Sequence, residues 1–141
     1  MMRIFFDSSA FAKRYIEEIG SEKVLDFFSE AGETIVSVIC PIEILSGLNR
    51  LRREKKITGL QYHKLKSAVA MDIKKATVLD IAPSVVQQAI RCLETCVIRS
   101  LDAIHLGTAL EASCDLFVTA DRRQYNAGRR IGLKVVFIEK K

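Results

Sequence analysis

The sequence has no long hydrophobic run. Charged residues such as Glu43 and Asp102, or turn residues, interrupt its apolar stretches well before the roughly 18 positions that a membrane-spanning helix needs. At the N-terminus, Met1-Met2-Arg3 leads directly into a short apolar segment, without the pattern of an export signal. We therefore expect no membrane span, no signal peptide and a cytoplasmic location.

The sequence is also poor in the residues that build zinc sites and disulfide frameworks. It has 4 cysteines and 2 histidines, and no cysteines form a C-x-x-C pair. Cys92 and Cys96 lie one helical turn apart, but a tetrahedral zinc site needs further ligands from elsewhere. We expect core thiols in a reducing compartment.

The composition is that of a folded domain. Of the 141 residues, 49% are hydrophobic and 28% are charged, which excludes disorder. No linker, repeat or low-complexity segment divides the chain, so we predict a single domain over residues 1–141. The mean hydropathy is positive, which favours an oligomer or a protein partner. The net charge of +5 favours a polyanionic partner.

Strand and helix signals alternate along the whole chain, and this order predicts an α/β fold with a parallel sheet covered by helices. One helix start is well marked, because Thr58-Gly59-Leu60-Gln61 fits a capping box. The predicted strands are Ile4–Phe6, Thr34–Val38, Val78–Ile81, Leu116–Thr119 and Val135–Ile138.

Four carboxylates stand where the chain passes from a strand to a helix or where a helix opens. They are Asp7, Glu43, Asp102 and Asp121. Loops that leave the carboxyl ends of parallel strands gather on one rim of the sheet, so these side chains are expected to converge there. Each alone has an ordinary interpretation as a helix cap, a turn residue or a complement to the helix dipole. As a set they predict a site for a hard cation such as Mg²⁺ or Mn²⁺.

His105 follows Asp102 by three residues, which places both on one side of a helix. Its neighbours Ile104 and Leu106 are apolar, so we predict a packed histidine that hydrogen-bonds to backbone rather than a general base. Near Asp7, Ser8 or Ser9 is predicted to cap the first helix, which leaves the Asp7 carboxylate free.

Four segments resemble the PIN-domain ribonucleases, particularly the VapC-like toxins of toxin–antitoxin pairs. They are Asp7-Ser8-Ser9-Ala10-Phe11-Ala12-Lys13, Pro41-Ile42-Glu43-Ile44, Arg99-Ser100-Leu101-Asp102-Ala103-Ile104-His105-Leu106 and Phe117-Val118-Thr119-Ala120-Asp121. The resemblance covers nearly the whole chain. It implies a three-layer α/β/α fold with a central, mainly parallel sheet.

The resemblance also implies a function. Asp7, Glu43, Asp102 and Asp121 would take the catalytic and metal-binding positions of an Mg²⁺- or Mn²⁺-dependent endoribonuclease, with Ser9 and Thr119 as polar supports. Hydrolysis would leave a 5′-phosphate and a 3′-hydroxyl. Lys13, Arg122 and Arg123 are the candidate RNA contacts. Some relatives have a further acid shortly after the fourth, and Arg122, Arg123 and Gln124 stand there instead, so a complete second metal site is in question.

The expected partners are an RNA substrate, a small antitoxin and a second copy of the chain. Apolar residues on the helices after the first two strands are the predicted antitoxin groove: Phe11, Tyr15, Phe27, Phe28, Leu48 and Leu51. The main alternative is a PIN-like module that binds RNA or protein without cleavage. A haloacid-dehalogenase-like phosphatase is disfavoured because Ser9 stands where its second carboxylate belongs. A receiver domain is disfavoured because no lysine after the last strand is a convincing match to the partner lysine of that fold.

Overall fold

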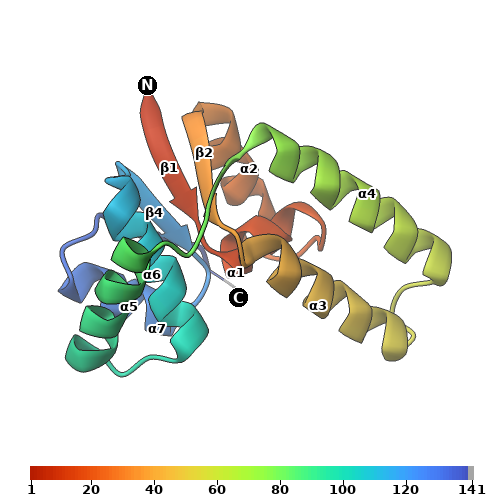
Figure 1. Cartoon of the computed structure of the whole chain (residues 1–141). Coiled ribbons are helices and arrows are strands. Elements are labelled where there is room, and N and C mark those ends of the chain that lie inside the picture. Colours follow the sequence, from red (N-terminus) through yellow and green to blue (C-terminus); the bar gives the residue numbers. More distant parts are fainter. Residues whose placement is uncertain (140–141) are drawn as a thin grey trace.

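The computed structural model describes residues 1–139, which form one parallel β-sheet with helices on both faces (Figure 1). All four strand pairings are parallel, and the strand order is β3-β2-β1-β4-β5. The strands are β1 (Met2–Phe6), β2 (Ala31–Ser37), β3 (Thr77–Leu79), β4 (Leu116–Thr119) and β5 (Val135–Phe137). The predicted three-layer α/β/α architecture is confirmed.

The helices fall into two layers. The connections are α1 (Ser8–Phe11), a 3-10 turn η1 (Ala12–Arg14), α2 (Ser21–Glu30), α3 (Cys40–Arg53), α4 (Gly59–Lys75), α5 (Pro83–Thr95), α6 (Ser100–Ala112) and α7 (Arg122–Arg130). Helices α1 to α4 contribute to one hydrophobic core and α5 to α7 to the other. No helix among residues 1–139 is both long and apolar enough to cross a membrane.

Successive side chains of the central strands point alternately into the two hydrophobic cores. Ile4 and Phe6 of β1 lie in the core under α1 to α4, whereas Phe5 lies in the core under α5 to α7. Side chains of a strand point alternately to the two faces of its sheet, so a strand buried on both sides is apolar throughout. The ring of Phe5 stacks on Phe117 of β4 with centroids 5.2 Å apart.

Helices α3 and α4 form a hairpin that extends away from the sheet (Figure 1). The predicted capping box is confirmed, since Thr58 accepts from the backbone N–H of Gln61 and Gln61 accepts from that of Thr58. Between the helices, the Asn49 amide donates to the Tyr62 hydroxyl at 2.9 Å, and the Arg52 guanidinium lies 4.2 Å from the Tyr62 ring centroid. These contacts hold the two helices together near the turn that joins them.

The first helix is short: α1 ends at Phe11 and the 3-10 turn η1 ends at Arg14. The Lys13 side chain is fully buried, and its ammonium donates to Glu18 Oε1 at 2.9 Å and to the Ile19 carbonyl at 2.8 Å. These bonds fold the following segment back over Lys13. A continued helix would carry Glu18 and Ile19 away from it.

The predicted antitoxin groove is corrected for two of its six residues and stays a prediction for the others. Phe11 and Leu48 are buried in the core, and the other four residues are partly buried and packed against it: Tyr15, Phe27, Phe28 and Leu51. The sheet face beneath α1 to α4 is wide enough to need these side chains for its own core. Phe11 and Leu48 therefore offer no open surface to a partner, whereas the other four keep part of their surface exposed.

Candidate active site

A pocket of about 120 Å³ lies at the carboxyl ends of β1, β2 and β4. All four predicted carboxylates line it: Asp7, Glu43, Asp102 and Asp121. The rest of its wall is formed by Ser8, Ser9, Arg99, His105 and Gln124. The four acids come from four different chain segments, so the rim of the parallel sheet brings them together as its topology predicts.

Asp7 follows β1 directly and caps α1. Its Oδ1 accepts from the Ala10 backbone N–H at 3.0 Å and from the Ser9 hydroxyl at 2.7 Å, while its Oδ2 accepts from the Thr119 hydroxyl. Asp7 itself, and neither Ser8 nor Ser9, therefore provides the cap. Burial raises the pKa of Asp7, and the neighbouring His105 and the three hydrogen bonds only partly oppose this.

Ser9 and Thr119 support Asp7 from two sides and also fix the end of β4. The Ser9 hydroxyl accepts from the Ala120 backbone N–H at 2.9 Å, and the Thr119 hydroxyl accepts from the Asp121 backbone N–H at 3.0 Å. Each hydroxyl thus donates to the carboxylate and accepts from the chain after β4. This arrangement fixes the Asp7 carboxylate against the loop that carries Asp121.

Glu43 lies in the first turn of α3 and is partly exposed. Its Oε1 accepts from the Ser8 hydroxyl and contacts His105 Nε2, both at 2.6 Å. Burial alone would raise the pKa of Glu43, but the hydrogen bonds from His105 and Ser8 outweigh it and hold that pKa below its ordinary value. The carboxylate is therefore kept ionised in the pocket.

Asp102 and Asp121 share one cation, Arg99. The Nε of Arg99 lies 3.3 Å from Asp102 Oδ2, and a terminal nitrogen of the same guanidinium lies 3.8 Å from Asp121 Oδ2. Asp102 Oδ2 also accepts from the Arg99 backbone N–H at 3.1 Å, so Arg99, and not Ser100, is the capping residue of α6. Asp121 in turn caps α7 by accepting from the Arg123 N–H at 2.8 Å.

His105 is packed, as predicted, but its hydrogen bonds differ from the prediction. Its ring is buried edge-on to Phe5, and Nε2 faces Glu43 and Ser8 rather than backbone. Within the part of the chain that the structure describes, its Nδ1 has no hydrogen-bond partner, and neither has Oε1 of the buried Gln124. The three-residue spacing of His105 from Asp102, of Gln124 from Asp121 and of Arg99 from Asp102 is the sequence signal that places these side chains in the pocket.

The three predicted RNA contacts have different environments. Lys13 is buried and engaged with Glu18 and Ile19, so it is not exposed for a ligand. The Arg122 guanidinium lies 4.0 Å from the Phe137 ring centroid. Arg123 is exposed beside the pocket. Among the described residues, Arg123 is the one of these three side chains that is exposed and contacts no aromatic ring.

The donor set fits a hard divalent cation, because carboxylate oxygens dominate the pocket and Arg99 already places positive charge between two of them. The present side-chain positions are not those of an assembled site. Over residues 1–139, no group of three His, Cys, Asp or Glu side chains is close enough to hold a metal ion. Asp102 and Asp121, two of the acids that would hold an ion, are the ones that Arg99 contacts.

Comparisons with known proteins show the family and the fold. A family model described as PIN domain matches residues 4–130. The structure of FitAcB from Neisseria gonorrhoeae is similar with a TM-score of 0.73 at 16% identity, over 94% of this chain and 95% of that one. VapC20 of Mycobacterium tuberculosis, described as a Sarcin-Ricin loop cleaving toxin, gives 0.70 at 16% identity over 89% and 95%.

DNA-bound VapBC from Salmonella typhimurium gives a TM-score of 0.66 at 15% identity, over 96% of this chain and 98% of that one. No curated protein matches the chain. At these identities the likeness to solved structures shows the fold, and it extends over nearly the full length of each chain.

Proposed function

The chain belongs to the PIN domain family, and on that premise we propose that it is a metal-dependent endoribonuclease that acts as the toxin of a toxin–antitoxin pair. The observation that carries this proposal is the convergence of Asp7, Glu43, Asp102 and Asp121 on one small pocket. A set of acids held so close together is costly to the protein unless a cation compensates it.

When bound, Mg²⁺ or Mn²⁺ would supply a positive centre that acidifies a water molecule and offsets charge on the reacting phosphate. Asp7, Glu43 and Asp102 are the proposed ligands, and Asp121 is proposed to assist a second ion that also needs oxygens from the substrate. Ser9 and Thr119 orient Asp7 through their hydroxyls. Arg99 and Arg123 are the donors proposed for phosphate oxygens.

The test is cleavage of RNA with Mn²⁺ by purified protein and four variants. Asp7→Asn, Glu43→Gln and Asp102→Asn should each abolish cleavage, and Asp121→Asn should weaken it less. Asp26→Asn, an exposed acid of α2, is the matched control and should cleave normally. Undiminished cleavage by folded Asp7→Asn, Glu43→Gln and Asp102→Asn would falsify the assignment.

A non-cleaving binding module is the second candidate function. The observation that favours it is that Arg99 and His105 already contact Asp102, Asp121 and Glu43, so three of the four acids have a partner without metal. A wild-type protein that binds RNA or a protein partner, takes up no Mn²⁺ and never cleaves would establish this alternative.

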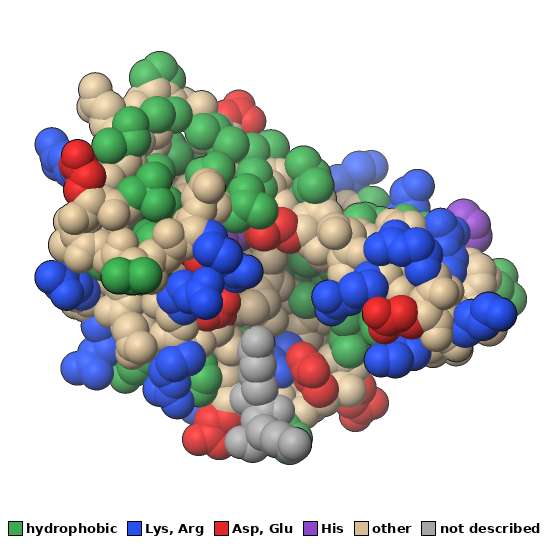
Figure 2. All heavy atoms as spheres, turned by 90° about the horizontal axis from the view of Figure 1, so that it is seen from below, with side chains coloured by type: hydrophobic (Ala, Val, Ile, Leu, Met, Phe, Trp, Pro, Cys, Tyr) green, Lys and Arg blue, Asp and Glu red, His purple; other side chains and the backbone are tan. Residues whose placement is uncertain are grey.

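The proposed protein partners are a small antitoxin and a second copy of the chain. Helix α5 exposes Val86, Ile90 and Leu93 on one side while burying Val85 and Cys92 on the adjacent side. Figure 2 views the carboxyl end of the sheet and shows a hydrophobic patch over the α5 side of this face. We assign this stripe to the second copy. Ile90→Asp should convert a dimer into a monomer in sedimentation, and co-expression of an antitoxin should restore growth that the chain alone arrests.

A further inference from the structure

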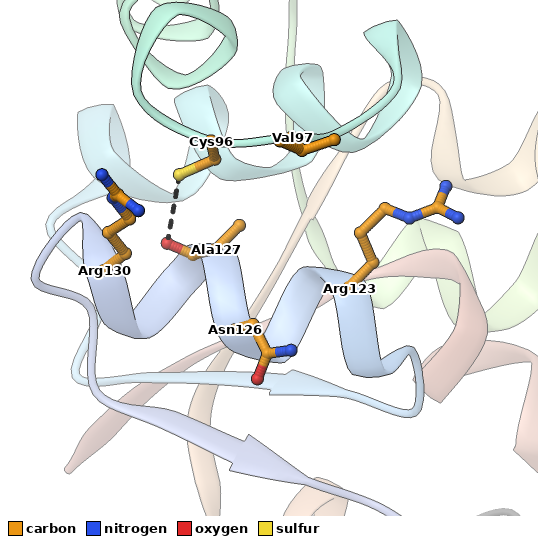
Figure 3. A pocket seen from close by; sticks show the side chains of 6 residues that line it. All are labelled: Cys96, Val97, Arg123, Asn126, Ala127 and Arg130. Carbon is orange, nitrogen blue, oxygen red and sulfur yellow. Dashed lines mark hydrogen bonds between the residues drawn. The ribbon is translucent and has the colours of Figure 1, made fainter.

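A groove of about 310 Å³ lies between helix α7 and the connection that joins α5 to α6 (Figure 3). Its lining consists of Cys96, Val97, Arg123, Asn126, Ala127 and Arg130. The Cys96 thiol and the Ala127 carbonyl, 3.9 Å apart, mark where the connection approaches the helix. Two arginines line the groove, and none of its lining residues is acidic.

The four arginines of α7 are divided between two sides of the helix. Arg122 and Arg129 lie toward the aromatic rings: Arg122 is 4.0 Å from the Phe137 centroid, and Arg129 donates to the Tyr125 hydroxyl at 3.2 Å. Arg123 and Arg130 line the groove instead. Each pair is seven residues apart, which is close to two turns and therefore one side of the helix.

The groove arginines are free of acidic partners among the described residues, because none of the ion pairs there involves Arg123 or Arg130. Their side chains point toward opposite ends of the groove (Figure 3). Their Cα atoms are about 10 Å apart along the helix. Two such charges suit successive positions on an extended polyanion better than a single small anion.

The other groups in the groove match the rest of a nucleotide. The Asn126 amide can both donate and accept hydrogen bonds. Val97 is 96% exposed although it is apolar, and it stands on the opposite wall from Asn126 (Figure 3). An exposed apolar side chain next to unpaired cations offers a surface for a base or ribose while the arginines meet phosphates.

The groove begins beside the acidic pocket. Asp121 lines the pocket and accepts the backbone N–H of Arg123, whose side chain lines the groove. Arg99, which contacts Asp102 and Asp121, lies two residues after Val97. A strand that leaves the pocket therefore meets Arg123 and then Arg130.

We propose that this groove binds the backbone of an RNA strand that continues from the pocket, with Arg123 and Arg130 on different phosphates and Val97 against a base or ribose. The inference rests on the proposed nuclease function and specifies how that function holds its substrate. The lack of acids in the lining and the opening beside the pocket favour RNA over a protein partner.

The test is binding of a fluorescent single-stranded oligouridine by anisotropy, in chelator so that no strand is cut, over a series of salt concentrations. Each lost phosphate contact should lower the slope of log affinity against log salt by about 0.7, so Arg123→Gln with Arg130→Gln should lower it by about 1.4. Arg122→Gln with Arg129→Gln removes the same charge from the same helix and should leave the slope nearly unchanged. Thermal unfolding of both double variants checks the fold.

Two further variants separate the parts of the groove. Arg123→Lys with Arg130→Lys keeps the charges and should keep the slope. Val97→Ser should weaken binding without changing the slope, because an apolar contact releases no counterions. If the lysine variant alone misfolds, the Val97→Ser result still decides whether the groove contacts RNA.

Equal slope losses for the two arginine pairs would overturn the proposal, as they would reveal a general charge effect. Normal RNA binding by the groove variants together with lost antitoxin binding would also overturn it and assign the groove to a protein. A cleavage assay with Mn²⁺ on the same RNA is read separately. If the two arginine pairs differ in slope but the protein never cleaves RNA, the groove is supported and the nuclease function is rejected. If the protein cleaves RNA but the two pairs do not differ in slope, the nuclease function is supported and the groove is rejected.

Discussion

His105 Nε2 lies 2.6 Å from Glu43 Oε1, and the two residues belong to helices on opposite faces of the sheet. The contact closes the floor of the acidic pocket across the end of β1. Because His105 is buried and contacts a proposed metal ligand, we expect it to position Glu43 rather than to accept a proton from water.

His105→Gln should keep Mn²⁺-dependent RNA cleavage within about tenfold of the wild type, because an amide can still donate to Glu43. Loss of a general base would cost about 10²- to 10⁴-fold. Cleavage rates at saturating Mn²⁺ provide the measurement, with Mn²⁺ affinity and thermal unfolding as controls. A folded variant with normal Mn²⁺ affinity and a loss above a hundredfold would show that the histidine is a base.

Asp7→Asn should stabilise the metal-free protein at neutral pH by about 1 kcal/mol, as replacements of strained active-site groups commonly do. Burial raises the pKa of Asp7, so its charge is held at a cost that an amide avoids. The carbonyl oxygen of the introduced amide can still accept from Ala10 and Ser9. Urea unfolding in chelator is the measurement and Asp26→Asn the control; a less stable Asp7→Asn protein would contradict the expected cost.

Arg99→Ala should tighten Mn²⁺ binding about fivefold, because it removes an exposed positive charge that repels the ion. Arg99 contacts both Asp102 and Asp121, so it would compete with a bound ion for these two carboxylates. Calorimetric titration measures the affinity. Arg91→Ala removes an exposed charge from α5 and should leave it unchanged. Weaker Mn²⁺ binding without Arg99 would mean that this guanidinium arranges the carboxylates for the ion.

Glu33 should make stability depend on pH in the acid range. Its carboxylate accepts from Arg3 Nε and from the Thr77 hydroxyl, both at 2.7 Å, and so connects β1, β2 and β3. These bonds lower the pKa of Glu33. The unfolded chain then binds the proton more readily, so the contribution is complete above the ordinary value of about 4.3 and is lost as pH falls through the lowered pKa.

The measurement for Glu33 is urea unfolding of the wild type and Glu33→Gln over a range of pH. The variant should be the less stable protein at neutral pH, and the difference should shrink as the solution becomes more acidic. A difference that stays constant with pH would show that shape rather than charge is responsible.

Two glycines in helix interiors should respond oppositely to alanine. A Cβ on Gly107 of α6 would lie 2.8 Å from the Ala89 nitrogen and 2.9 Å from the Val85 carbonyl oxygen, both backbone atoms of α5. Gly107→Ala should therefore destabilise the protein by about 1–3 kcal/mol. Gly47 of α3 has open space at this position, and Gly47→Ala should stabilise by about 0.5–1 kcal/mol. Urea unfolding gives both values, and changes of the same sign would contradict the close approach of α5 and α6.

Local sequence patterns were sufficient to predict the parallel sheet and the convergence of the four acids. Parallel strands end on one rim, so the positions of Asp7, Glu43 and Asp121 after their strands already placed them in one pocket. The Thr58 capping box is similarly local, because its two bonds join residues three apart.

The burial of individual side chains depends on tertiary packing, and the sequence did not predict it. Lys13 looked like a surface cation, but Glu18 and the Ile19 carbonyl satisfy its charge in the interior. Phe11 and Leu48 looked like a docking surface because nothing in the sequence reveals how much apolar area one face of the sheet requires. The seven-residue spacing of the α7 arginines could have been recognised, but the aromatic neighbour Phe137 that holds Arg122 comes from a later strand.

The short connection between α5 and α6 carries Val97 at the groove and Arg99 at the pocket. The two side chains are separated by a single residue, so a displacement of the backbone that moves one also moves the other. Pressure on Val97 from a bound strand would be transmitted to the guanidinium that bridges Asp102 and Asp121. An inserted residue between Val97 and Arg99 would break this mechanical link and let the two sites act independently.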